Sequence, residues 1–186
     1  MKKEILKVEH LQKIYGNRGY GQPVLDDISF TVYQKDFVAI MGPSGSGKTT
    51  LLNLISSIDR PTRGHVVLNG SDLTSLSSKQ LAKLRKDSIG FIFQDYSLLD
   101  SMPLLDNIVL PLSLNGEKAA VSLQKGKKLA RLFGLANHLD KYPYQLSGGQ
   151  KQRGATCRAL IMNPSIVFAD EPTGALDSKS SKDLLE

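Results

Sequence analysis

Residues 42–49 read Gly-Pro-Ser-Gly-Ser-Gly-Lys-Thr, and this stretch decides the fold that we expect. It matches the phosphate-loop pattern G-x-x-x-x-G-K-[ST], which is specific when a strand precedes it and a helix follows it. The apolar run Phe-Val-Ala-Ile-Met occupies residues 37–41, and residues 50–55 have helical spacing. We therefore predict a strand, a phosphate loop and a helix in succession.

The chemistry of this loop depends on its glycines and its lysine. Glycine permits backbone angles that let successive amides converge on an anion at the positive end of a helix. Lys48 is expected to reach the β- and γ-phosphates of a nucleotide, and the Thr49 hydroxyl is expected to hold Mg²⁺. The predicted nucleotide-binding residues here are Gly42, Pro43, Ser44, Gly45, Ser46, Gly47, Lys48, Thr49 and Thr50.

An acidic pair follows a second apolar run. Residues 166–169 read Ile-Val-Phe-Ala, and Asp170 and Glu171 come directly after them. In this Walker B arrangement, Asp170 is expected to bind Mg²⁺ and Glu171 to orient and deprotonate the attacking water. Such a pair can also be a solvated turn, but the phosphate loop favours the catalytic interpretation.

A second glycine-rich segment, residues 146–150, reads Leu-Ser-Gly-Gly-Gln and precedes a helical stretch. Its amides and the Ser147 hydroxyl are expected to direct a helix N-terminus at an anion. The predicted anion-binding residues are Ser147, Gly148, Gly149 and Gln150. The simpler alternative is a serine cap followed by flexible glycines.

The order of these motifs resembles the ATP-binding cassette of ABC transporters. It runs from the phosphate loop through Gln94, residues 146–150 and the pair at residues 170–171 to Ala-Leu-Asp at residues 175–177. The resemblance implies an α/β P-loop NTPase (RecA-like) core with an antiparallel β region and an inserted helical subdomain. The core is expected over residues 1–95 and 163–186, and the helical subdomain over about residues 96–162, within a single domain of residues 1–186.

The resemblance also implies roles for single residues. Tyr15 is expected to stack on adenine, and Gln94 to contact Mg²⁺ or the water and to sense a membrane partner. Residues 147–150 are expected to act in trans on the nucleotide of a second cassette, head to tail, with Asp177 at that interface. The implied catalytic residues are Glu171, Lys48 and Gln94, and the implied Mg²⁺ ligands are Thr49, Gln94 and Asp170. Tyr15 could instead be a packing residue at a turn, and Gln94 could merely cap a strand.

Residues 91–100, 141–143 and 168–178 look like one branch of the family. It contains macrolide exporters, lipoprotein-releasing systems and bacitracin-type peptide-antibiotic transporters, the last being most similar. The expected function is the ATP-binding and ATP-hydrolysing subunit of a bacterial exporter for antimicrobial-peptide or antibiotic resistance, which powers a separate membrane permease. This places it in the cytoplasm, peripheral to the inner face of the cell membrane.

The composition is that of an ordinary globular domain. The chain has 186 residues, of which 40% are hydrophobic and 23% charged, and its net charge is +6. Neither a secretory leader nor a membrane-spanning run is expected from its apolar pattern. The densest basic group, Lys125, Lys127, Lys128 and Arg131, is predicted to be a solvated helix face, so no nucleic-acid partner is expected. Cys157 is predicted to be a buried structural thiol.

The chain departs from the family pattern after the acidic pair. No residue stands in for the switch histidine that contacts the γ-phosphate in the family, so slow hydrolysis by this chain is expected. A missing strand would also leave exposed apolar surface. Two alternatives stay open: a nucleotide-binding fragment without turnover, and a soluble ABC protein acting on DNA or ribosomes. The second usually carries coiled-coil or zinc insertions, which are not visible in this sequence.

Overall fold

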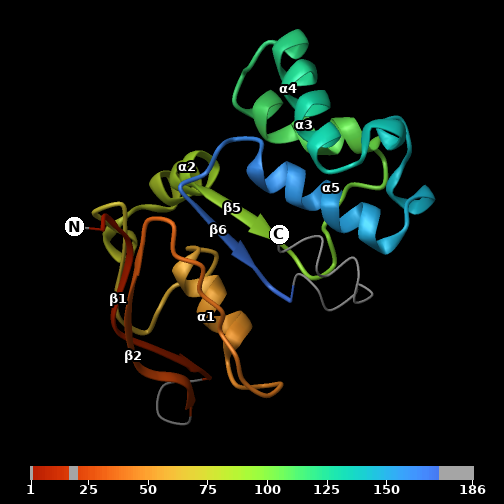
Figure 1. Cartoon of the computed structure of the whole chain (residues 1–186). Coiled ribbons are helices and arrows are strands. Elements are labelled where there is room, and N and C mark those ends of the chain that lie inside the picture. The colour runs from red at the N-terminus through yellow and green to blue at the C-terminus, as the bar shows by residue number, and fades with distance from the viewer. Residues whose placement is uncertain (1, 17–20, 172–186) are drawn as a thin grey trace. The chain divides into compact units, whose positions relative to one another are not determined.

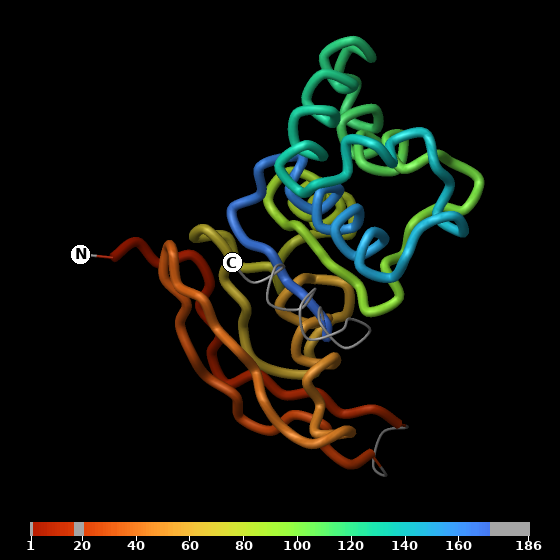
Figure 2. The backbone as a smooth tube through the Cα atoms, turned by 45° about the vertical axis from the view of Figure 1, so that its right-hand side comes forward, coloured from red at the N-terminus to blue at the C-terminus, as the bar shows by residue number. Residues whose placement is uncertain are grey.

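Two long strands, β1 (Glu4–Tyr15) and β2 (Gln22–Tyr33), begin the computed structural model, which describes residues 2–16 and 21–171 (Figure 1). The chain divides into two units, Met1–Arg85 and Lys86–Glu186. In the first unit, β3 (Arg63–Leu68) and β4 (Ser71–Asp72) complete an antiparallel sheet in the order β2-β1-β3-β4. Figure 2 shows β1 and β2 side by side as long, curved strands. The predicted antiparallel β region is therefore present.

The first unit is held together by alternating apolar residues on its strands. Leu6 and Val8 of β1 are buried and pair with Leu68 and Val66 of β3. Alternate residues of a strand share one face, so these side chains form a common apolar layer. The helix α1 (Lys48–Ile55) buries Leu51, Leu52, Leu54 and Ile55.

The strand predicted over residues 37–41 is not formed. These residues adopt no regular structure, and Phe37 and Met41 are 81% and 89% exposed. A strand exists only where its backbone pairs with a neighbour, and this segment adds to neither edge of the sheet, which is bounded by β2 and β4. The high β propensity of residues 37–41 predicted a strand. Among the described residues of this unit, no strand pairs with them.

The second unit contains a parallel strand pair. A short turn, η1 (Leu73–Ser75), and the helix α2 (Ser78–Ser88) lead to β5 (Ile89–Ile92), which pairs with β6 (Ile166–Ala169). Ile89 lies opposite Ile166, and Ile92 lies opposite Ala169. Continuous apolar runs are typical of parallel strands, and both of these runs form strands here.

Helices occupy the sequence between β5 and β6. They are α3 (Leu104–Leu114), α4 (Ala119–Leu132) and α5 (Gly148–Leu160), with short 3₁₀ turns η2 (Ala136–His138) and η3 (Pro143–Gln145). Their shared core is formed by Leu104, Ile108, Ala130, Leu135, Leu146 and Cys157. α3 ends at Leu114, and Asn115 and Gly116 follow it before α4 begins. The predicted division into core (1–95 and 163–186) and helical subdomain (about 96–162) stays a prediction.

Candidate nucleotide-binding site

The phosphate loop (residues 42–49) turns into α1 through two left-handed glycines. Gly45 and Gly47 have φ angles of 80° and 89°, and Gly47 is the N-cap of α1. A Cβ atom at Gly47 would come within 3.0 Å of the backbone oxygen of Val24 and of a methyl group of Leu25 in β2. Both the backbone angle and the contact with β2 therefore require glycine at this position.

The Lys48 side chain contacts the backbone of the phosphate loop. Its Nζ donates to the carbonyl oxygens of Gly42 at 2.9 Å and Pro43 at 2.8 Å. Gly47 offers no side chain to cap the first amides of α1. The loop thus combines an ammonium group with the positive end of a helix, which is the chemistry of an anion cradle.

Tyr15 ends β1 and is half exposed, at 49%. Its hydroxyl donates to Oδ2 of Asp59 at 2.9 Å, and Nζ of Lys13 lies over its ring, 4.7 Å from the centroid. Burial raises the pKa of the Tyr15 hydroxyl above its usual value of 10.0, Asp59 adds to this effect, and Lys13 and a hydrogen bond with Thr50 oppose it. The tyrosine is therefore protonated at neutral pH and stays a donor to Asp59.

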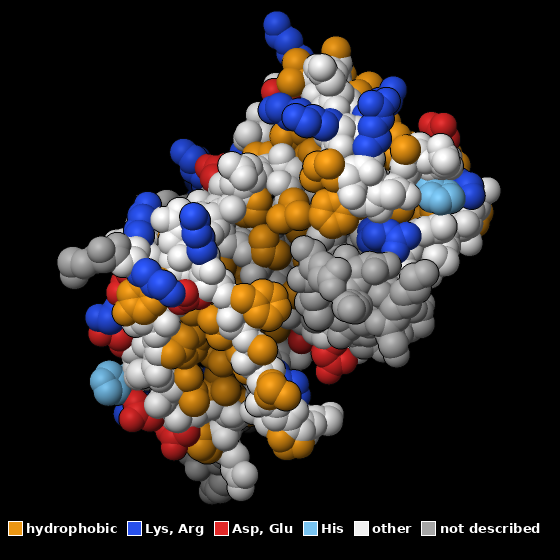
Figure 3. Space-filling model, viewed as in Figure 1, with side chains coloured by type: hydrophobic (Ala, Val, Ile, Leu, Met, Phe, Trp, Pro, Cys, Tyr) orange, Lys and Arg blue, Asp and Glu red, His pale blue; other side chains and the backbone are white. Residues whose placement is uncertain are grey.

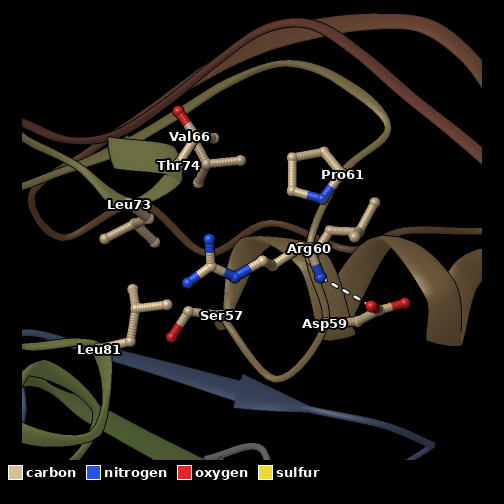
Figure 4. A pocket seen from close by; sticks show the side chains of 9 residues that line it. Ser57, Asp59, Arg60, Pro61, Val66, Leu73, Thr74 and Leu81 are labelled. Atoms are coloured by element: carbon tan, nitrogen blue, oxygen red, sulfur yellow. Dashed lines mark hydrogen bonds between the residues drawn. The ribbon is translucent and has the colours of Figure 1, made fainter. Parts of the chain in front are cut away.

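A pocket in the first unit lies next to Asp59 and Arg60 (Figure 4). Apolar side chains that include Leu54, Leu73 and Leu81 also line it. It has room for about one water molecule, so it is not a nucleotide site.

In the second unit, two predicted catalytic residues meet at the carboxyl ends of β5 and β6. The amide of Asp170 donates to the Ile92 carbonyl at 3.0 Å, which extends the strand pair by one residue. Beyond it, Nε2 of Gln94 donates to Oε2 of Glu171 at 3.1 Å. Parallel strands bring residues that follow them to the same edge of a sheet, so this contact results from the topology.

Glu171 adopts a strained backbone. Its φ angle is 45°, in the left-handed region that costs a non-glycine residue about 1–2 kcal/mol. Strain of this kind is concentrated at functional sites, where surrounding contacts hold it in place. The contact with Gln94 is one such contact.

The predicted Mg²⁺ ligands are a mixed set of oxygen donors. Among residues 2–16 and 21–171, no three His, Cys, Asp or Glu side chains gather as a metal-binding group. Because the nitrogen of the Gln94 amide faces Glu171, its oxygen is the atom left to act as a ligand. An amide oxygen, a hydroxyl at Thr49 and a carboxylate at Asp170 are hard donors that fit Mg²⁺.

The signature loop (residues 146–150) begins α5 with a capping box. The backbone amide of Gln150 donates to Oγ of Ser147 at 3.3 Å, and the backbone amide of Ser147 donates to Oε1 of Gln150 at 2.9 Å. Nε2 of Gln150 also lies 3.2 Å from Nε2 of His138. Ser147 therefore caps its own helix as an acceptor, and its hydroxyl proton stays available to an anion.

The structure assigns the predicted residues to two units. Tyr15 and the phosphate loop belong to Met1–Arg85, whereas Gln94, the signature loop and residues 170–171 belong to Lys86–Glu186. Asp177 lies outside the described residues.

Sequence reasoning missed Lys13, Asp59 and Arg158. The first two meet Tyr15, and Nη2 of Arg158 in α5 donates to the carbonyl oxygen of Tyr96 at 2.8 Å. No sequence motif marks these contacts, because each contact joins residues that are far apart in the chain.

Comparison with known families gives a match over most of the chain. Residues 25–174 match the family model described as ABC transporter. The chain belongs to the ABC transporter family. As a member of this family, the cassette is an ATPase, and it has the α/β fold that the sequence predicted. No helix in the described part of the cassette has both the length and the apolar character needed to cross a membrane.

Three relatives illustrate the similarity. The cassette is 50% identical to the bacitracin export ATP-binding protein BceA of Halalkalibacterium halodurans, over 97% of this chain and 72% of that protein. It is 47% identical to the macrolide export ATP-binding/permease protein MacB of Syntrophobacter fumaroxidans, over 98% of this chain and 26% of that one. The dimeric cassette MJ0796, in a post-hydrolysis state bound to ADP and Pi, superposes with a TM-score of 0.90 at 36% identity, covering 97% of this chain and 80% of that chain.

Proposed function

We propose that this cassette binds Mg·ATP and hydrolyses it to drive a separate membrane permease that exports a peptide antibiotic. The observation that carries the proposal is the phosphate loop, with its ammonium group held at the N-terminus of α1 by two loop carbonyls. Similarity to a bacitracin export protein supports the substrate class. The cassette would then lie in the cytoplasm at the inner face of the membrane, bound to its permease.

Each site residue has a chemical task in this proposal. Tyr15 stacks on adenine, the phosphate-loop amides and Lys48 hold the phosphates, and Thr49, Asp170 and Gln94 are ligands for Mg²⁺. Bound Mg²⁺ would neutralise charge on the phosphate oxygens. Glu171 accepts a proton from the attacking water, and Gln94 positions Glu171 through the hydrogen bond between their side chains.

A second copy of the cassette completes the site. Ser147, Gly148 and Gly149 of one copy contact the γ-phosphate held by the other, so a symmetric pair contains two sites. Similarity to a dimeric cassette supports this arrangement. Asp177 is proposed to lie at the interface.

The first experiment measures Mg·ATP binding and phosphate release by the parent and three variants. Lys48→Ala should abolish binding, because it removes the ammonium group of the loop. Glu171→Gln should keep binding and lower phosphate release by at least about a hundredfold. Lys127→Ala, on the exposed face of α4, is the control and should change neither. Binding without release by the parent would favour a nucleotide-binding fragment, and no binding would refute the proposal.

The transport role needs a cellular test. A bacterial strain carrying the gene for this cassette and its permease should resist bacitracin, and resistance should be lost with Glu171→Gln. Equal susceptibility of the two strains to bacitracin, with a difference for a macrolide, would instead indicate macrolide export. No difference for either drug would contradict the antibiotic-export proposal.

A further inference from the structure

We infer that Asp59, tied to Lys13, is a positioning residue that orients the ring of Tyr15 for the adenine base. The inference rests on the proposed function, since it takes Tyr15 as the residue on which adenine stacks. All three side chains belong to the first unit.

One carboxylate oxygen joins the three side chains. Oδ2 of Asp59 accepts from the Tyr15 hydroxyl at 2.9 Å and lies 2.7 Å from Nζ of Lys13. The Lys13 ammonium also donates to the carbonyl oxygen of Arg60 at 2.7 Å, and its side chain is only 11% exposed. A lysine held in this way by two oxygen atoms has little freedom to move, so its charge stays beside the tyrosine.

Asp59 is itself anchored to the end of α1. Its amide donates to the carbonyl oxygen of Asn53 at 3.0 Å, and Ile58 donates to the same oxygen at 2.8 Å. Its second carboxylate oxygen, Oδ1, accepts from the amide of Arg60 at 2.7 Å (Figure 4). Because α1 begins at Lys48, one short helix connects the phosphate loop to the carboxylate that holds Tyr15. The distance between ring and loop is therefore set by a rigid element.

The ring of Tyr15 presents one face to the lysine. Lys13 and Tyr15 are two residues apart on β1, so their side chains lie on the same side of the strand. Nζ of Lys13 lies 4.7 Å from the ring centroid, which is within the range of a cation–π contact. Since the cation lies over one face and Asp59 holds the hydroxyl, a purine would stack on the opposite face of the ring.

The test compares two ligands that share their phosphates but differ in the base. Binding of Mg·ATP and of Mg·tripolyphosphate is measured by calorimetry for the parent chain and for Asp59→Ala, Tyr15→Phe, Tyr15→Ala and the double variant Asp59→Ala/Tyr15→Ala. Thermal unfolding of each variant verifies that it is folded. Glu9→Gln is the matched control, because it breaks a 2.7 Å ion pair with Lys7 on the same strand, away from Tyr15.

The inference predicts a loss confined to ATP. Asp59→Ala should weaken ATP binding about three- to tenfold and leave tripolyphosphate binding within about twofold, the expected effect of losing one hydrogen bond that orients the ring. In the Tyr15→Ala background, the loss of Asp59 should have no further effect on ATP. Tyr15→Phe removes the hydroxyl, and with it the hydrogen bonds to Asp59 and Thr50, while leaving Lys13 paired with Asp59. It should therefore also weaken the binding of ATP and leave the binding of tripolyphosphate unchanged. This variant decides the matter if Asp59→Ala fails to fold.

Three outcomes would overturn the inference, and they can be told apart. Equal weakening of ATP and tripolyphosphate by Asp59→Ala would mean that Asp59 acts on the phosphate loop or on the fold. An unchanged affinity of Tyr15→Phe for ATP would mean that the hydroxyl contact does not orient the ring. If Tyr15→Ala itself binds ATP as tightly as the parent, the proposed adenine contact of Tyr15 fails, and the positioning role fails with it.

Discussion

Cys157 illustrates how burial determines the chemistry of a single residue. The thiol lies in the core of the second unit, and burial raises its pKa to about 12. Since the thiolate is the reactive form, a thiol reagent at pH 8 should label the native chain about a thousandfold more slowly than the chain in denaturant. The chain has one cysteine, so the absorbance of released thionitrobenzoate reports this residue alone. Complete labelling of the native chain within minutes would contradict its buried position.

The carboxylate of Asp59 should make stability depend on pH. Burial raises its pKa, but hydrogen bonds from Lys13, the Arg60 amide and Tyr15 outweigh that effect and hold the pKa below its usual 3.8. A carboxyl group with a lowered folded-state pKa stabilises the fold above its unfolded pKa, and this stabilisation is lost as the pH falls through the folded-state value.

Urea unfolding of the parent and of Asp59→Asn from pH 7 to pH 3 measures this effect. The parent should be the more stable at neutral pH, and the difference should shrink below about pH 4. A difference that stays constant into acid would show that the charge of Asp59 is not responsible.

At the scale of elements, Gly64 shows how closely β3 approaches β1 in the sheet of the first unit. Its φ angle is 86°, and a Cβ atom there would come within 2.3 Å of the His10 carbonyl oxygen in β1. Gly70 has a similar φ of 78°, but a Cβ atom there would meet nothing within 4 Å. The two positions therefore separate backbone strain from a steric clash.

Alanine at these two glycines should have unequal effects on the free energy of unfolding. Gly70→Ala should cost about 1–2 kcal/mol for the left-handed backbone alone. Gly64→Ala should cost about 1–3 kcal/mol more, because a carbonyl oxygen of β1 cannot move aside as a flexible side chain can. Urea unfolding of both variants provides the comparison. Equal losses would mean that the contact between Gly64 and His10 is not tight.

At the scale of the whole molecule, the exposed segment at residues 37–41 should make the chain associate. Phe37 and Met41 are 81% and 89% exposed. Figure 3 shows hydrophobic side chains gathered on the visible face of the first unit, in the region where Figure 1 places α1. Contiguous apolar surface favours association and binds hydrophobic dyes.

The double variant Phe37→Ser/Met41→Ser should reduce both light scattering and the fluorescence of a bound hydrophobic dye. Leu132→Ser, at a 75% exposed position of α4, is the control and should change either signal less. If the control and the double variant behave alike, association does not depend on residues 37–41.

Much of the fold could be predicted because local pattern and final structure agree. The continuous apolar runs at residues 89–93 and 166–169 became β5 and β6, and the glycine spacing of the phosphate loop produced the expected turn into α1. Residues 37–41 did not follow their pattern, since pairing depends on a neighbour that propensity cannot supply.

The contacts that sequence reasoning missed are those between distant residues. Lys13 meets Asp59 and Arg158 meets Tyr96 across long stretches of chain, and neither pair follows a helical or strand period. Composition showed that charged groups were present, whereas their partners were determined only by how the elements pack. The contact between Gln94 and Glu171 could be predicted in part. Each residue follows a strand that the sequence predicts, but the pairing of the two strands depends on the fold.

The capping box of Ser147 and Gln150 bears on how fast two cassettes can engage. The side chains of Ser147 and Gln150 already form hydrogen bonds with each other's backbone amides within one chain. Ordering a side chain during association costs about 0.5–1.5 kcal/mol, so a turn that is already ordered loses little conformational entropy on contact. Under the proposed function, encounter of the two copies would then be limited by diffusion and orientation, and not by the time that a loop takes to find its bound shape.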